Sequence, residues 1–117
     1  MSLNKIFLSG KLTKDVDIRP TRESTIAEFT IAINRVYTKD GETIEKTVFP
    51  RITVWGKKAE ECSKRLHRGS VVLIEAHLEA DNFIDKKTGE ERRRIEIVAD
   101  WIHYGEVRMA DENGGNS

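Results

Sequence analysis

Residues 48–69 read VFPRITVWGKKAEECSKRLHRG and contain a change of hydrophobic period. Apolar and polar side chains alternate over residues 48–55, which is typical of a β-strand. After the break at Gly56, apolar residues recur at spacings of three and four, which predicts a helix over residues 57–66. Gly69 is well placed to end that helix. The apolar positions of the helix are Ala59, Cys62 and Leu66.

Alternation with a period of two dominates the rest of the chain and predicts four more strands, over residues 5–12, 25–37, 70–83 and 91–102. An Asp-Gly turn at residues 40–41 and a hairpin tip at residues 85–90 separate neighbouring segments. The residues expected to face the core are Ile6, Leu8, Leu12, Ala27, Phe29, Ile31, Ile33, Val48, Ile52, Val54, Val72, Ile74, Ala76, Leu78, Ala80, Ile95, Ile97, Ala99 and Trp101. Three strands, one helix and two strands predict an all-β chain with the OB fold, a five-stranded Greek-key barrel with one helix between strands three and four.

Length and composition place one domain over residues 1–105 and a disordered, Gly-rich polar tail over residues 106–117. The 20 Lys and Arg residues balance the 20 Asp and Glu residues, so composition alone does not favour nucleic acid as a partner. A phosphate site therefore needs local clustering of cations. One cysteine, no secretory leader and no membrane span make the cytoplasm the expected location.

Catalytic chemistry has little support in the sequence. The histidines His67, His77 and His103 do not have the spacing of metal ligands, and there is no glycine-rich phosphate loop or nucleophile elbow. Cys62 lies on the apolar stripe of the predicted helix, where a buried side chain is the simpler interpretation. We therefore expect no enzyme activity, no metal and no cofactor.

The outward face of the third strand carries Phe49, Arg51 and Trp55. Exposed aromatic rings beside a cation suit single-stranded nucleic acid, because every base can stack and every linkage carries a phosphate. From the pattern alone, packing under a loop or in a subunit interface is equally consistent with these rings. Tyr37 and Phe83 end two other strands, and each taken alone fits a loop anchor better than a stacking platform. Phe7, Phe29 and Trp101 are expected in the core or an interface.

Cations are spread along the chain, and most are expected to be solvated. The three consecutive arginines 92–94 alternate faces in a strand, so they do not form one stripe. Some of them can pair across the hairpin with Glu79, Asp81 or Asp85.

Several segments, taken together, resemble the bacterial single-stranded DNA-binding protein family. They are NKIFLSGKLT at residues 4–13 with Asp15 and Arg19, FTIA at 29–32, VWGK at 54–57 with Ala59-Glu60, RGS at 68–70 with Val72, and IEIVAD at 95–100. They occur in the family's order and spacing from about Asn4 to Tyr104, which is more specific than any one motif.

The resemblance implies an OB-fold protomer, usually a homotetramer, that wraps single-stranded DNA without strong sequence preference in replication, recombination and repair. It implies a cytoplasmic, nucleoid-associated protein. By resemblance the stacking aromatics are Tyr37, Phe49, Trp55 and Phe83, and the phosphate-contacting cations are Lys5, Lys11, Arg19, Arg51 and Lys57, with Lys64 or Arg68 as weaker candidates.

Three features depart from the family pattern. Residues 78–83 are acidic where relatives are often basic, and Pro50 stands beside a stacking aromatic where relatives often carry a backbone donor. The family's acidic and hydrophobic C-terminal tip does not occur at residues 113–117, so we expect no tail-dependent protein partners. Two alternatives stay open: an OB nuclease, and an OB module for RNA or for protein partners such as a primosome accessory.

Overall fold

The structure, a computed structural model, describes residues 1–105. The predicted tail at residues 106–117, and with it the expectation about tail-dependent partners, lies outside the described residues. The elements in chain order are β1 (Ile6–Leu12), β2 (Asp17–Pro20), β3 (Thr25–Lys39), β4 (Glu42–Val48), β5 (Arg51–Trp55), α1 (Lys57–Arg65), β6 (Val71–Ile84) and β7 (Glu91–Tyr104).

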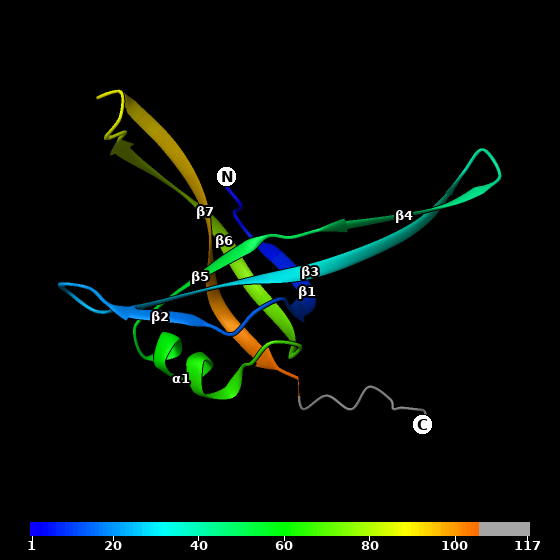
Figure 1. Ribbon diagram of the computed structural model, residues 1–117, viewed down its shortest axis with the longest axis horizontal. Coiled ribbons are helices and arrows are strands. Elements are labelled where there is room, and N and C mark those ends of the chain that lie inside the picture. Colours follow the sequence, from blue (N-terminus) through cyan, green and yellow to red (C-terminus); the bar gives the residue numbers. More distant parts are fainter. Residues whose placement is uncertain (106–117) are drawn as a thin grey trace.

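Five of the strands close into a barrel in the order β1-β6-β7-β5-β3 (Figure 1). Closure takes place where the end of β1 leaves β6 and pairs with β3, at Lys11 with Ala32 and Leu12 with Ile31. β5 and β7 pair in parallel, and the other pairings are antiparallel. The one helix within residues 1–105 follows β5, so the predicted OB fold is confirmed.

Two long hairpins project from the barrel, β3–β4 on one side and β6–β7 on another (Figure 1). The β3–β4 hairpin turns at Asp40 and Gly41, whose φ angles are 51° and 79°. Positive φ at both central residues is what a tight two-residue hairpin turn requires, and it explains the Asp-Gly pair in the sequence.

The predicted third strand is two strands in the structure, because β4 ends at Val48 and β5 begins at Arg51. Pro50 has no N–H to donate to a ladder, so the strand breaks before it. The Pro50 carbonyl still accepts a hydrogen bond from the Ile31 N–H at 3.1 Å. As a result β4 belongs to the projecting hairpin and Val48 is exposed rather than inward, whereas Ile52 and Val54 are fully buried.

Helix α1 covers the barrel with Ala59, Cys62 and Leu66, all buried as the spacing predicted. The helix ends earlier than expected, with an extended C-cap at Leu66, and Gly69 instead serves the following turn at a φ of 90°. Burial raises the pKa of the Cys62 thiol to about 11, so the thiol stays protonated and unreactive near neutral pH.

Besides Val48, four residues predicted to face the core are exposed, namely Leu78, Ala80, Ile95 and Trp101. The first three lie where the β6–β7 hairpin has left the barrel. Trp101 is turned outward by a bulge: Glu75 pairs with Trp101 but Ala76 pairs with Ala99, so Asp100 is an extra residue. Because side chains alternate faces, one extra residue moves every following side chain to the opposite face.

Gly10 lies where β1 passes from β6 to β3, and a Cβ there would stand 2.6 Å from the Ala32 carbonyl oxygen of β3. We expect Gly10→Ala to destabilise the fold by about 1–3 kcal/mol, because the nearest atoms belong to the backbone of Ala32, which cannot move aside as a flexible side chain can. Urea denaturation measures this, with exposed Ser9→Ala as the matched control. Equal midpoints for the two variants would show that the strands separate easily at this point.

Candidate nucleic-acid interface

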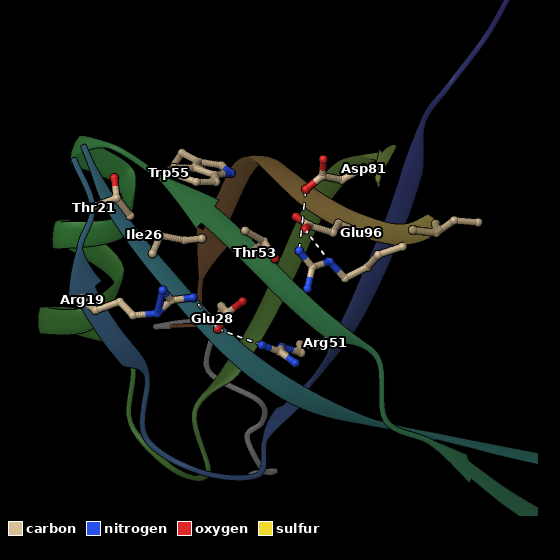
Figure 2. Close-up of a pocket in the computed structure, with 11 residues that line it drawn as sticks. Arg19, Thr21, Ile26, Glu28, Arg51, Thr53, Trp55, Asp81 and Glu96 are labelled. Atoms are coloured by element: carbon tan, nitrogen blue, oxygen red, sulfur yellow. Dashed lines mark ion pairs between the residues drawn. The ribbon is translucent and has the colours of Figure 1, made fainter. Parts of the chain in front are cut away.

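A hollow of about 360 Å³ opens on the outer face of β2, β3 and β5 and reaches the base of the β6–β7 hairpin (Figure 2). β2 contributes Arg19, β3 contributes Glu28, and β5 contributes Arg51 and Trp55. The outward residues of the β5 sequence are thus brought together with a cation from a strand more than thirty residues away. The remaining lining residues are Thr21, Ile26, Thr53, Asp81, Arg94, Ile95 and Glu96.

The two arginines of this face share one carboxylate. Arg51 Nη2 lies 2.8 Å from Glu28 Oε1, and Arg19 Nη2 lies 3.6 Å from the same oxygen. Both arginine side chains are more than half exposed, whereas the Glu28 side chain is only 18% exposed. The two cations, on β2 and β5, therefore flank a recessed anion on β3.

The opposite wall of the hollow has a similar arrangement around Arg94. Its guanidinium lies 3.6 Å from Asp81 Oδ2, 3.4 Å from Glu96 Oε2 and 4.8 Å from the centre of the Phe83 ring. Arg92 Nε lies 3.0 Å from Asp85 Oδ2. The prediction that some of the arginines 92–94 pair across the hairpin is therefore confirmed for Arg92 and Arg94.

The four predicted stacking aromatics come from three parts of the fold. Phe49, in the connection from β4 to β5, and Trp55, at the end of β5, are 60% and 45% exposed. Tyr37 lies on the β3–β4 hairpin with the Arg35 guanidinium 4.9 Å from its ring centre, and Phe83 lies on the β6–β7 hairpin. Of the four, Trp55 alone lines the hollow.

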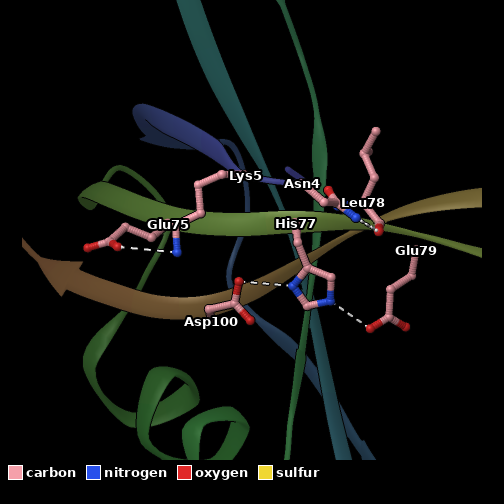
Figure 3. Close-up of polar contacts among 7 residues, drawn as sticks. All are labelled: Asn4, Lys5, Glu75, His77, Leu78, Glu79 and Asp100. Atoms are coloured by element: carbon pink, nitrogen blue, oxygen red, sulfur yellow. Dashed lines mark hydrogen bonds and ion pairs between the residues drawn. The ribbon is translucent and has the colours of Figure 1, made fainter. Parts of the chain in front are cut away.

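The remaining predicted cations are not gathered in the hollow. Lys5 does not line the hollow: its Nζ lies 3.8 Å from Glu75 Oε1 of β6 (Figure 3). The same Nζ lies 5.9 Å from the centre of the Phe7 ring. Lys11 on β1 and Lys57 at the start of α1 are exposed, as are Lys64 and Arg68. The structure therefore unites Arg19, Arg51 and Trp55 and leaves the other candidates around the barrel.

One acidic residue of the β6 segment, Glu79, has a partner within the protein, namely His77. Its Nδ1 lies 2.9 Å from Asp100 Oδ2 and its Nε2 lies 2.7 Å from Glu79 Oε2 (Figure 3). The hydrogen bonds to Glu79 and Asp100 raise the pKa of His77, because they favour the protonated ring. Glu79 is thus a structural partner of His77, and Asp81 is the acid of this strand that borders the hollow.

Sequence reasoning missed Glu28, Arg94 and Glu96 as parts of this site. Alternation places Glu28 on the outward face of its strand, but nothing in the sequence indicates that cations from β2 and β5 flank it. Within residues 1–105, no three His, Cys, Asp or Glu side chains gather as a metal site would require. In the same part of the chain, no helix is long and apolar enough to cross a membrane.

Comparison with known proteins agrees with this geometry. The profile of the single-strand binding protein family matches residues 3–109. Single-stranded DNA-binding protein 1 of Staphylococcus aureus strain MSSA476 is 35% identical over 113 residues, covering 95% of this chain and 70% of the relative. Single-stranded DNA-binding protein 1 of Chlorobaculum tepidum is 36% identical, covering 98% and 71%, and protein 3 of Clostridium acetobutylicum is 31% identical, covering 95% and 76%. With its closed OB barrel and its aromatic and arginine-bearing outer face, the chain belongs to the single-strand binding protein family.

Proposed function

We propose that this chain binds single-stranded DNA with little sequence preference and protects it during replication, recombination and repair, as a binding protein rather than an enzyme. The carrying observation is the exposed Trp55 in a hollow that Arg19 and Arg51 also line. The ring can stack on any base, and the neighbouring guanidinium groups can bind backbone phosphates. Bases and phosphates are present in every single strand, whatever its sequence.

The proposed site extends beyond the hollow. Tyr37, Phe49, Trp55 and Phe83 stack bases, and Lys5, Lys11, Arg19, Arg51 and Lys57 contact phosphates. The exposure of Phe49 and Trp55 supports this assignment, because neither ring packs into the barrel core. The DNA-binding domain is residues 1–105, and the proposed location is the nucleoid in the cytoplasm.

Titration with oligo-thymidine strands of several lengths at two salt concentrations tests the proposal. We expect quenching of tryptophan fluorescence that saturates at a defined number of nucleotides, and weaker binding of a duplex of equal length. The absence of binding to any single strand at low salt would refute the function.

We also propose that the chain assembles into a homotetramer. No described strand pairs with β1 along residues 6–10 on the edge facing away from β6, and a free edge can pair with its copy. The outer face of the adjoining sheet exposes Phe7, Leu73 and Trp101. A pairing edge and an apolar face are two different self-complementary surfaces, which is what a tetramer with two kinds of two-fold interface requires.

The acidic end of β6 should make the salt dependence of binding shallow. Each phosphate neutralised on a single strand contributes about −0.7 to the slope of log affinity against log salt. Asp81 stands at the hollow where a cation would neutralise one more phosphate. Changing Glu79 and Asp81 together to Lys should steepen the slope and tighten binding at low salt, whereas stacking should persist at high salt.

Fluorescence titrations at four or more salt concentrations measure this slope. Asp81→Lys alone is the control, because Glu79→Lys also removes the hydrogen bond with His77. An unchanged slope in both variants would place this strand end off the DNA path, and the role of Phe83 would fall with it.

A further inference from the structure

Glu28 occupies the centre of the outer face that carries the proposed DNA site. In the strand register it lies between Asp17 of β2 and Thr53 of β5. Arg19 reaches it from β2 and Arg51 from β5, as Figure 2 shows. A single carboxylate thus stands between two cations that the proposed function assigns to DNA phosphates.

The geometry of the two ion pairs leaves this carboxylate displaceable. Both arginines engage Oε1, one closely at 2.8 Å and one loosely at 3.6 Å. Both arginine side chains are more than half exposed, so an incoming anion can reach them from solvent. Ion pairs with such exposure are weak, which means that a competing phosphate does not have to overcome a strong bond.

Glu28 and Arg51 also line a second hollow of about 220 Å³, together with Lys14, Asp15 and Asp17. Their ion pair therefore lies between this hollow and the one that contains Trp55. A strand that crosses the face from one hollow to the other must pass over the pair.

The hollow that contains Trp55 is balanced in charge. Its three arginines, Arg19, Arg51 and Arg94, all contact carboxylates of Glu28, Asp81 or Glu96 in the same lining. In the free protein these cations are therefore already paired with carboxylates of the same chain, and a phosphate has to compete with those carboxylates.

We propose that Glu28 is an internal counter-anion that occupies Arg19 and Arg51 in the free protein and that a DNA phosphate displaces. This inference rests on the proposed function and assigns Glu28 a regulatory part in it. Glu28 lowers the affinity and the salt dependence, because its own charge loses a partner whenever a phosphate takes the arginines. The face then releases and rebinds a strand more readily than one with unpaired arginines.

Glu28→Gln tests the proposal because it removes the charge and keeps the shape. We expect roughly fivefold tighter binding of oligo-thymidine at low salt, and a slope steeper by about 0.7 for each further phosphate that the freed arginines neutralise. Glu61→Gln is the matched control: it changes net charge equally, but Glu61 lies on α1, paired with Arg65 outside the hollow. It should leave affinity and slope nearly unchanged.

A second background isolates the arginines. When Arg19 and Arg51 are both changed to Gln, Glu28→Gln should no longer tighten binding. Equal or weaker binding by Glu28→Gln in the otherwise unchanged chain, with a melting temperature close to the parent's, would overturn the inference. So would an equal increase in affinity for Glu61→Gln, because the effect would then be one of net charge. Failure of the parent chain to bind any single strand would instead refute the proposed function.

Discussion

Replacing Trp55 with alanine should weaken binding of a single strand about tenfold or more, because a stacked base is worth about 1–3 kcal/mol. Trp55 is 45% exposed and lines the hollow, so loss of its ring removes a stacking surface without opening the barrel core. Fluorescence anisotropy of a labelled oligo-thymidine strand measures the change. Phe49→Ala, which removes a ring that is 60% exposed, should cost a similar factor.

The intrinsic fluorescence of the chain comes from two exposed tryptophans, so the signal of Trp55 has to be separated from that of Trp101. The sequence predicts a buried Trp101, but the side chain is 56% exposed on the outer face of β7. A Trp101→Phe background leaves Trp55 as the one indole, and we expect strand binding to quench most of its signal. Quenching as complete in a Trp55→Ala variant as in the parent would remove Trp55 from the site.

Changing Phe7 and Trp101 together to Lys should break the assembly into smaller units. Both residues pair in register with Glu75, so a lysine at either position meets an opposite charge within the protomer and the fold is retained. In an interface between copies the same charges would be desolvated at a cost of several kcal/mol each, roughly enough to separate the subunits.

Sedimentation measures the mass of the parent and the variant. Val36→Lys with Val48→Lys is the matched control, since it adds equal charge at exposed valines of the β3–β4 hairpin. We expect the parent and the control to share a mass several times 13.4 kDa and the Phe7 and Trp101 variant to be smaller. A parent chain that sediments as a monomer at micromolar concentration would contradict the tetramer.

The local features of the fold could be predicted from the sequence because each depends on near neighbours. Alternation placed Ala27, Phe29 and Ile31 in the core, and the three-and-four spacing placed Ala59, Cys62 and Leu66 under the helix. Asp-Gly predicted a hairpin turn with positive φ at both residues, which glycine adopts without steric cost and aspartate tolerates. The order of these elements was sufficient to identify the barrel, and collinear motifs were sufficient to identify the family.

Only the tertiary structure showed where the alternating strands stop facing the barrel core. Leu78 and Ala80 continue the inward pattern of β6, yet they are exposed because the hairpin has left the barrel. The bulge at Asp100 turned the Trp101 side chain to the opposite face of β7. No residue pattern in the sequence before Asp100 predicts this bulge. Pairing between strands distant in sequence sets both outcomes, so local periodicity does not contain them.

The site divides in the same way. Alternation in the sequence placed Arg51 and Trp55 on one outward face suited to a single strand, since residue type and outward position are local properties. The family resemblance added Arg19. Only the pairing of β2, β3 and β5 showed that Glu28 stands between the two arginines. Charge balance at a surface depends on distances between side chains from different strands, and those distances exist only once the sheet has formed.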